Sequence, residues 1–346
     1  MNFSIANARL HLAKCLWTSF VFLFAACAWQ AAAETSRSEF VMDTTCTIRI
    51  TKGGDDAALD AAFARLRQID SELSEQDPKS EISAVNAASG IKPVSVSDDS
   101  IAMVKRDLSY AEMSDGAFDP TVGPLVKLWG IGTDHERLPS KEEIRSTLAL
   151  VNWKDVVLDE KAKTLYLKRK GMALDFGSGT KGYATDEIVK VLAARGVTSA
   201  VIDLGGNIFV MGSNDGKPWR VGLQNPDQSR GAYLGIAQLV NQTMVTSGVY
   251  ERFFVKDGKR YHHIFDTKTG YPADNKLASV TIVTAKSFNA DGCTTMLFVL
   301  GREKGMALAK ELGLDVIMVD EAHNVYVSQG VSKYFKIADT EYKLAD

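Results

Sequence analysis

The chain has 346 residues, of which 45% are hydrophobic and 24% are charged, so it is long enough for one large globular domain or two ordinary ones. Its formal net charge is -3, and no block rich in Lys and Arg supplies the positive stripe that nucleic-acid binding requires. The composition therefore argues against a nucleic-acid-binding protein, and any phosphate-binding site has to be local.

The N-terminus differs in composition from everything after it. Two basic residues precede an apolar run over residues 16–28, and three alanines at 31–33 follow it. This order is typical of an export signal, and the run is shorter than the roughly 20 apolar residues of a membrane-spanning helix. We expect residues 1–33 to be a signal peptide and residues 34–346 to form one domain that works in the periplasm.

Two processing sites compete in this segment. The small-residue pattern favours cleavage after Ala33, whereas residues 24–27 resemble a lipoprotein box with Phe in place of the usual Leu. Lipidation at Cys27 would attach the protein to the inner membrane, so both alternatives stay open. Cleavage after Ala33 would leave only Cys46 and Cys293, and two distant thiols indicate neither a disulfide framework nor a zinc site.

The first half of the domain alternates between strand and helix patterns. Hydrophobic periodicity, capping residues and Gly/Pro content give the following expectations. They are a strand over 39–50, a helix over 55–73, a loop with short turns over 74–89, a helix over 98–113 capped by Ser97 or Asp98, a loop over 116–132, a hairpin over 154–170 and a short buried strand over 171–176.

The second half begins with a helix and continues mainly with strands. We expect a helix over 180–195 ended by Gly196, strands over 199–203 and 208–211, mostly strands up to residue 263, a strand over 278–284, helices over 287–300 and 302–312, and strands over 315–319 and 325–328. Strands mixed with helices in this way predict the α+β fold class in a single compact unit.

A glycine-rich turn at residues 175–182 is the first candidate site. Its sequence DFGSGTKG places an acid, Asp175, before the turn and a base, Lys181, at the start of the following helix. Unpaired N–H groups and the positive dipole end at a helix start favour an anion such as a diphosphate. The sequence matches neither of the common nucleotide-binding glycine patterns, so a plain strand-to-helix turn is the alternative.

Asp291 and Thr295 form the second candidate. They are four residues apart at the start of a predicted helix, so their oxygens can face one point. A carboxylate with hydroxyl and carbonyl oxygens suits Mg²⁺ bound together with substrate phosphates. The alternative is a capping acid and a threonine bonded to its own helix.

His263 and Asp266 form the third candidate, at a strand end that runs into a turn. An acid near a histidine can set its tautomer and let it accept a proton, although a structural histidine is the alternative. The Gly/Pro-rich segment 116–124 is the fourth, either a rigid wall against a planar ligand or only a loop.

Taken in chain order, these segments resemble the ApbE family of FAD:protein FMN transferases. The resemblance covers the chain from about residue 40 onward and implies an ApbE-like, T-fold-related arrangement of mixed sheets with packed helices. The matching blocks are SEIS at 80–83 with Asn86, GAFDPTVGPLVKLWG, DFGSGTKGYATD, IDLGGNIFVMG, TSGVYERFF, HIFDTKTGYP and DGCTTMLFVLG.

The resemblance also implies a set of site residues. Magnesium would be held by the backbone oxygen of Ser178 and by the side chains of Asp291 and Thr295. The residues implied for FAD are Met42, Gln76, Ala117, Phe118, Asp119, Asp175, Lys181 and the backbone near Ile264. A threonine hydroxyl of an exported flavin-accepting domain would attack the FMN-side phosphorus of FAD and expel AMP, with His263 as base; that Asp266 orients this base is our own inference.

Several positions depart from the family pattern. Gln76 stands where an aromatic is frequent, Thr294 where some members have another acid, Val249 where an acid is common and Thr267 where proline is usual. These departures leave two alternatives to transfer: an FAD pyrophosphatase that uses water as the nucleophile, and a periplasmic flavin-binding protein without turnover. The family's acceptors are typically membrane redox subunits, such as those of ion-pumping quinone reductases.

Overall fold

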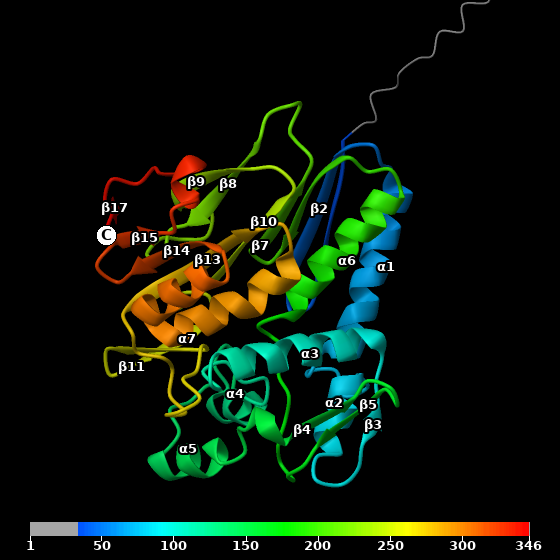
Figure 1. The fold of residues 1–346 in the computed structure, drawn as a ribbon, viewed down its shortest axis with the longest axis vertical. Coiled ribbons are helices and arrows are strands. Elements are labelled where there is room, and N and C mark those ends of the chain that lie inside the picture. Colours follow the sequence, from blue (N-terminus) through cyan, green and yellow to red (C-terminus); the bar gives the residue numbers. More distant parts are fainter. Residues whose placement is uncertain (1–33, 346) are drawn as a thin grey trace, which may run out of the picture. The chain divides into compact units, whose positions relative to one another are not determined.

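A nine-stranded sheet lies at the centre of the computed structural model, which describes residues 34–345 (Figure 1). The expected signal peptide, with Cys27 and Ala33, lies outside these residues. Neighbouring strands are antiparallel except for the last pair, β15 and β17. In spatial order the strands are β1 (Thr35–Val41), β2 (Thr44–Lys52), β6 (Ser199–Leu204), β7 (Asn207–Met211), β10 (Gln242–Gly248), β13 (Leu277–Thr284), β14 (Asp315–Asp320), β15 (Asn324–Val327) and β17 (Lys343–Leu344).

Helices cover one face of this sheet, and a smaller sheet covers part of the other. The helices are α1 (Asp56–Leu73), α6 (Thr180–Ala194) and α7 (Ser287–Glu311), and their buried apolar residues form cores with the sheet (Figure 1). The smaller sheet consists of β16 (Phe335–Ile337), β9 (Tyr233–Leu239) and β8 (Trp219–Gln224), which share a third apolar core with the central strands.

Shorter elements gather below the sheet in the view of Figure 1. The helix α3 (Asp98–Met113) is the longest of them, and its cap Ser97 accepts a hydrogen bond from the Ser100 N–H at 3.2 Å. The others are α2 (Glu81–Ala87), α4 (Gly123–Trp129), α5 (Lys141–Leu148), the short helix η1 (Trp153–Asp155), the sheet of β3 (Val94–Ser95), β5 (Thr164–Leu167) and β4 (Val156–Asp159), and the hairpin of β11 (Phe253–Lys256) and β12 (Lys259–His262). A second short helix, η2 (Val331–Lys333), precedes β16.

Most of the predicted elements are confirmed. The α+β class is correct, and α1, α3, α6 and the hairpin of β4 and β5 lie where the patterns placed them. The two helices predicted on either side of residue 301 form α7, which is broken at Gly301 by a backbone φ of 75°. Glycine tolerates this left-handed conformation, so the helix direction changes there.

Three predicted elements are wrong in part. The strand over 39–50 is two strands, because Met42 and Asp43 both have φ near +55° and form a tight turn. The loop over 74–89 contains α2, which Ser80 caps, and the loop over 116–132 contains α4, which has proline in its first turn.

The strand predicted over 171–176 does not form. Its backbone pairs with side chains and loops instead of with a neighbouring strand: the Leu174 N–H donates to Asn86 Oδ1 at 2.7 Å, and the Asp175 N–H donates to the Pro120 carbonyl at 2.9 Å. Asn86 Nδ2 returns a bond to the Leu174 carbonyl at 3.0 Å. Two of these three hydrogen bonds come from Asn86, which follows the SEIS block, so a side chain takes the place of a neighbouring strand.

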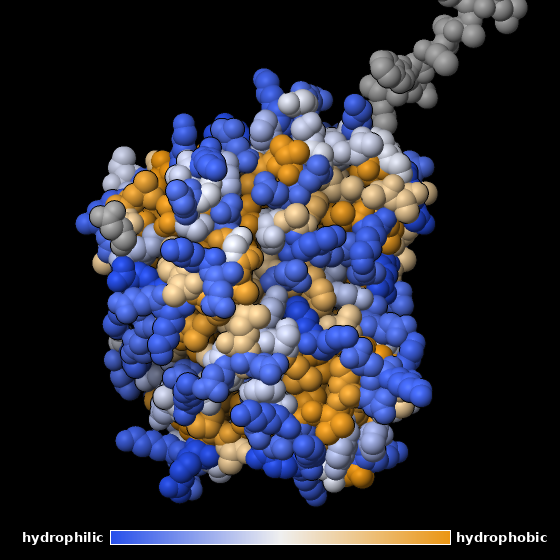
Figure 2. Space-filling view, in the orientation of Figure 1, coloured by the Kyte–Doolittle hydropathy of each residue, from blue (hydrophilic) through white to orange (hydrophobic). Residues whose placement is uncertain are grey.

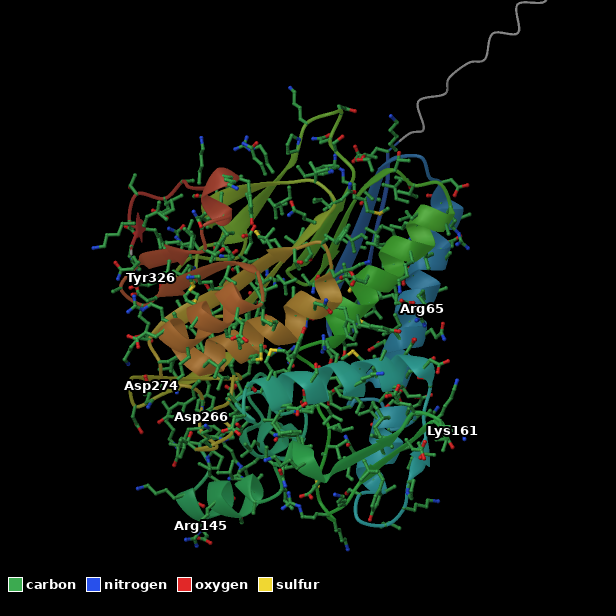
Figure 3. All side chains as sticks on the ribbon, viewed as in Figure 1. Arg65, Arg145, Lys161, Asp266, Asp274 and Tyr326 are labelled. Carbon is green, nitrogen blue, oxygen red and sulfur yellow. The ribbon has the colours of Figure 1, made fainter. Side chains whose placement is uncertain are left out.

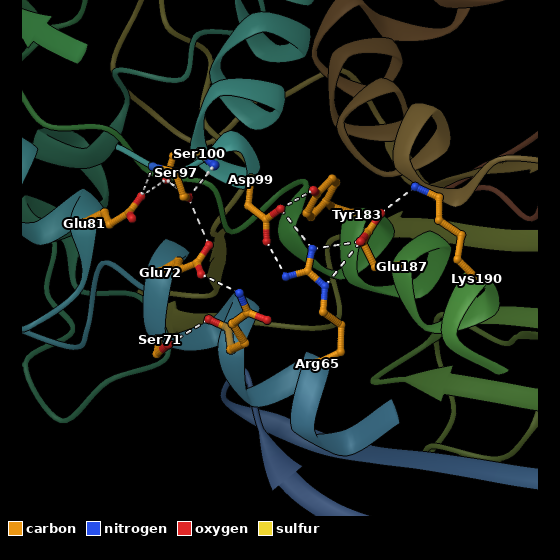
Figure 4. A network of polar contacts seen from close by, with 11 residues as sticks. Arg65, Ser71, Glu72, Glu81, Ser97, Asp99, Ser100, Tyr183, Glu187 and Lys190 are labelled. Atoms are coloured by element: carbon orange, nitrogen blue, oxygen red, sulfur yellow. Dashed lines mark hydrogen bonds and ion pairs between the residues drawn. The ribbon is translucent and has the colours of Figure 1, made fainter. Parts of the chain in front are cut away.

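A charged network joins α1, α3 and α6 behind the glycine-rich turn (Figure 4). Arg65 of α1 contacts Asp99 of α3 at 2.6 Å and Glu187 of α6 at 2.8 Å. The Tyr183 hydroxyl donates to Asp99 at 2.6 Å, and Lys190 contacts Glu187 at the network's edge. The network holds the first turns of α6 against the other two helices.

Hydrophilic residues cover most of the face shown in Figure 2, and hydrophobic residues appear on it in several separate patches. None of the helices within residues 34–345 is both long enough and apolar enough to cross a membrane.

Candidate functional site

The starts of α6 and α7 lie against each other at the centre of the site. The Gly182 N–H donates to Asp291 Oδ2 at 2.7 Å, and a Cβ added to Gly182 would lie 2.7 Å from the Asp291 Cβ. Gly182 is the third residue of α6, and an N–H in the first turn of a helix has no acceptor within that helix. The structure therefore brings Asp291 to the start of α6, two residues after Ser178, which is another of the predicted metal ligands.

Asp291 is a buried carboxylate, only 6% exposed. Burial raises its pKa, and the positive charge of Lys181 and the hydrogen bond from Gly182 oppose that rise. A buried carboxylate with one oxygen committed to a backbone N–H has its second oxygen available for a cation.

Thr295 lies one turn along α7 and belongs to a group of hydroxyls. Ser247 Oγ of β10 lies 2.8 Å from Thr294 Oγ1 and 3.1 Å from Thr295 Oγ1. Thr294 Oγ1 donates to the Asp291 carbonyl at 2.6 Å, so the threonine that bonds back to its own helix is Thr294, and not Thr295 as the alternative supposed. Among the hydrogen bonds of residues 34–345, the Thr295 hydroxyl has a single partner, Ser247.

These donors fit a hard cation. A carboxylate, a hydroxyl and a backbone carbonyl are all oxygen donors, which Mg²⁺ prefers, and few protein ligands leave room for water and phosphate. Within residues 34–345, no three His, Cys, Asp or Glu side chains come together as a metal cluster. A cation at this site would thus have one charged protein ligand, Asp291.

Arg106 of α3 contacts the first turn of α7 and packs against the residue that precedes α6. Its Nη1 donates to the Phe288 carbonyl in the first turn of α7 at 2.6 Å, and its Nε donates to the fully buried Asp107 at 2.8 Å. A Cβ on Gly179 would come within 1.8 Å of Arg106 Nη2, so only glycine leaves room for the guanidinium there. The arginine thus packs beneath the starts of both α6 and α7.

Lys181 lies among the other predicted site residues. Its Nζ donates to the Gly177 carbonyl at 3.2 Å. Burial raises the pKa of Asp175, whose side chain accepts from the Gly177 N–H at 2.9 Å, and the charges of Arg252 and Lys181 oppose that rise. The turn therefore holds a lysine and an acid side by side at the start of α6, where the helix dipole favours an anion.

Glu75 lies near this turn and was not predicted from the sequence. Burial, and then the negative charge of Asp175, raise the pKa of Glu75 to about 8. A protonated carboxyl donates a hydrogen bond where a charged one only accepts. Glu75 directly precedes Gln76, which is exposed on the same turn.

His263 is held in one tautomer by the backbone. Its Nδ1 lies 3.1 Å from the Arg252 carbonyl oxygen, which can only accept, so Nδ1 carries the proton and Nε2 has a free lone pair. Burial, and then the charge of Arg252, lower the pKa of His263 to about 3. The ring is therefore neutral near pH 7 and able to accept a proton at Nε2.

Asp266 occupies a different position from the one we inferred. Its side chain accepts from the Lys268 N–H at 2.8 Å and from the Thr269 hydroxyl at 3.2 Å, which closes the turn after His263. Among the hydrogen bonds of residues 34–345, none joins Asp266 to His263. The group that orients the His263 ring is therefore the Arg252 carbonyl, and not the Asp266 carboxylate as we inferred.

The segment 117–119 is buried next to the glycine-rich turn, because the following residue, Pro120, accepts from the Asp175 N–H. Ala117 and Phe118 are 7% and 4% exposed. Asp119 accepts from the Thr121 N–H at 2.8 Å and from the Trp153 N–H at 2.9 Å, so its carboxylate holds two loops together. The Asp119 side chain is thus committed to the protein, and Phe118 belongs to the apolar core that also contains Ile264.

The remaining predicted FAD contacts lie in three separate turns. Met42 is in the tight turn between β1 and β2, and its N–H donates to Asp70 Oδ2 at 3.3 Å. Ile264 is buried directly after His263, and its carbonyl accepts from the Ala273 N–H at 2.9 Å. Gln76 lies in the turn that follows α1.

Sequence reasoning missed the residues that support this site. Ser247 and Arg252 stand in the TSGVYERFF block without an assigned role. Asn207, in the IDLGGNIFVMG block, accepts from the Ser287 hydroxyl at 2.6 Å and so joins β7 to α7. Arg106 lies in no recognised motif, because its role depends on packing between helices that are distant in sequence.

The sequence and the fold are similar to those of known proteins. A sequence profile of the ApbE family matches residues 42–318. The chain is 36% identical over 330 residues to an FAD:protein FMN transferase of Treponema pallidum, a match that covers 90% of this chain and 91% of that protein. A crystal structure of the ApbE protein of Thermotoga maritima superposes with a TM-score of 0.81 at 29% identity, and the flavin transferase ApbE of Vibrio cholerae with 0.78 at 28% identity. Each of these two matches covers 87% of this chain and 99% of the other.

Proposed function

The chain belongs to the ApbE family and is an FAD:protein FMN transferase, and we propose that it uses Mg²⁺ to transfer FMN to a threonine hydroxyl of an exported protein. The observation that supports this proposal most directly is the packing of α6 against α7. It places a helix start and Lys181, which suit a diphosphate, beside Asp291, which suits a cation.

Ser178, Asp291 and Thr295 are the residues that would hold Mg²⁺. When bound, the ion would neutralise charge on the diphosphate of FAD as the bond to AMP breaks. Lys181 at the start of α6 would bind the same diphosphate. The buried segment 117–119 would exclude water from one side of the flavin.

His263 would accept the proton of the incoming hydroxyl. Its Nε2 has the free lone pair, because Nδ1 donates to the Arg252 carbonyl. The acceptor oxygen would form a bond to the FMN-side phosphorus, the bond between that phosphorus and the bridging oxygen would break, and AMP would leave with the electron pair. The products would be a phosphoester on the acceptor and free AMP.

We also propose that the protein works outside the cytoplasm. The support is the basic and apolar sequence of residues 1–33, followed by the small-residue cleavage pattern. Lipidation at Cys27 would add a membrane anchor, and mass spectrometry of the mature N-terminus would distinguish it from cleavage after Ala33.

The test of the reaction is to mix the purified protein with FAD, Mg²⁺ and the exported flavin domain encoded nearest its gene. Transfer gives covalent flavin on that domain and an equal amount of AMP, and removal of Mg²⁺ with a chelator stops both. AMP and FMN without covalent flavin would instead identify an FAD pyrophosphatase. FAD binding without any AMP would identify a flavin-binding protein.

A further inference from the structure

We propose that the outward face of the β11–β12 hairpin, formed by Phe253, Val255 and Arg260, is the docking surface for the flavin-accepting protein, and that the surface it binds is acidic. We call these three residues the hairpin face. The inference rests on the proposed function, because it concerns the partner of the same site.

Phe254 and Tyr261 pack against the protein on one face of the hairpin, whereas the other face is buried at its base, at His262, the cross-strand partner of Phe253. Phe254 and Tyr261, a cross-strand pair, stack at 5.2 Å, and Tyr261 packs against the buried Trp129 of α4 at 5.7 Å. Side chains alternate between the faces of a strand, so Phe253 and Val255 point the other way. They are 37% and 60% exposed, and no third strand pairs with β11 or β12 in residues 34–345.

The hairpin face has the composition of a protein interface. The Arg260 guanidinium lies 4.6 Å from the centre of the Phe253 ring, and Val255 is the cross-strand partner of Arg260. Aromatic side chains and arginine are enriched at interfaces, whereas solvent-exposed strands normally carry polar residues. An apolar and cationic face without a partner among residues 34–345 therefore points to a partner protein.

The charge of the hairpin predicts an acidic partner. Residues 252–262 contain four basic residues and one acidic residue, in a chain of net charge -3. Lys259 has a distant contact with Asp274 at 3.7 Å, and no carboxylate within residues 34–345 forms a salt bridge with Lys256 or Arg260. Such a local positive patch would steer an acidic protein surface toward this edge of the molecule.

The hairpin is also joined directly to His263. β12 ends at His262, and both the backbone N–H and Nδ1 of His263 contact the carbonyl of Arg252, the residue before β11. Arg260 is three residues from His263, or roughly 10 Å along an extended strand. An ordinary protein interface of about 800 Å² per partner extends roughly 16 Å from its centre. An acceptor protein centred on His263 would therefore cover the hairpin face.

The experiment compares the acceptor protein with a short peptide that carries the same acceptor threonine. Two variants of the full chain change the hairpin face, Arg260→Glu and Phe253→Ser with Val255→Ser. The control is Lys161→Glu, an exposed lysine on the opposite side of the view in Figure 3 from Asp274 and the hairpin. FAD binding is followed by flavin fluorescence in every variant.

We expect both hairpin variants to raise KM for the acceptor protein about tenfold, which corresponds to ~1.4 kcal/mol. KM for the peptide, kcat and FAD binding should stay within about twofold, and added salt should weaken the effect of Arg260→Glu. An unchanged KM for the acceptor protein, or equal losses with protein and peptide, would overturn the inference.

Binding of the wild type, but not of Arg260→Glu, to phosphatidylglycerol vesicles would assign the face to a membrane instead. If the wild type forms no covalent flavin at all, the proposed function itself fails.

Discussion

The Arg252 carbonyl accepts two hydrogen bonds from His263, one from the backbone N–H at 3.2 Å and one from Nδ1 at 3.1 Å. A carbonyl cannot donate, so the tautomer is fixed by the backbone and does not require a carboxylate. This arrangement leaves Nε2 free to accept a proton, so the role of base that we propose for His263 does not depend on Asp266.

His263→Gln should therefore slow transfer by roughly 10²- to 10⁴-fold, the usual contribution of a general base, while leaving FAD binding intact. Asp266→Asn should have a much smaller effect, because Asp266 closes a turn and does not contact the imidazole. Single-turnover transfer and FAD titration measure the two quantities. A loss in Asp266→Asn as large as in His263→Gln would show that the aspartate does orient the base.

Ser247 should tune the proposed metal site through Thr295. Ser247→Ala removes the hydroxyl that lies 3.1 Å from Thr295 Oγ1. Loss of a group that orients a metal ligand typically weakens metal binding about 10- to 100-fold, and we expect a loss of Mg²⁺ affinity of about that size. Thr246→Ala is the matched control, because the neighbouring hydroxyl contacts Thr281 instead. Mg²⁺ titrations of FAD binding and of transfer measure the change. Equal Mg²⁺ affinities in the two variants would contradict the assignment of Thr295.

The start of α6 should require glycine at position 179. Gly179→Ala places a Cβ 1.8 Å from Arg106 Nη2. The shifts that relieve such a clash typically lower the free energy of unfolding by about 1–3 kcal/mol. We expect a loss of that size in urea unfolding, together with weaker FAD binding. The loss should shrink when Arg106→Ala is combined with Gly179→Ala, because the collision partner is then gone. Strictly additive effects of the two substitutions would mean that the clash is not the cause.

Stability should fall in mild acid because of His262. Its Nε2 donates to the Ala273 carbonyl at 3.0 Å and its Nδ1 accepts from the Ile264 N–H, so the folded state holds the ring neutral. Burial lowers the pKa of His262 to about 4 from its ordinary 6.5. Above pH 6.5 the ring is neutral in both states and the stability is fully present. Between pH 6.5 and 4 only the unfolded chain gains a proton, so stability falls as the pH falls.

The measurement is urea unfolding of the wild type and His262→Gln at pH 7.5 and pH 5. The wild type should lose roughly 2 kcal/mol more between these pH values than the variant. His135→Gln is the control, since this histidine is 85% exposed and should leave the pH dependence unchanged. Parallel pH dependences of the wild type and His262→Gln would refute the explanation.

The sequence was most informative where a pattern is local. Amphipathic spacing and a serine cap were enough to place α3, and the break at Gly301 follows from a single residue type. The strand predicted over 171–176 failed because its partners are the Asn86 side chain and the Pro120 carbonyl, which no local pattern reveals.

In the candidate site, too, the sequence predicted the residues that belong to local motifs and missed those that act through packing. Family resemblance and local chemistry pointed to Asp291, Lys181 and His263, and the structure brings these residues to one region. The supporting groups were missed, because the Arg252 carbonyl has no side-chain signature and Arg106 acts through the packing of α3 beneath two distant helix starts.

The network at Arg65 should stabilise the fold around the site more than surface ion pairs do. Arg65→Ala leaves Asp99 and Glu187 without their shared cation, and all three side chains are less than 20% exposed, so we expect a loss of about 2 kcal/mol (Figure 4). Arg145→Ala is the control, since Arg145 and its partner Glu142 are 78% and 73% exposed (Figure 3), and such pairs contribute about 0.5 kcal/mol or less. Urea unfolding at neutral pH compares them. Because the network holds the first turns of α6, Arg65→Ala should also weaken FAD binding, whereas equal stabilities and equal FAD affinities in the two variants would contradict this role.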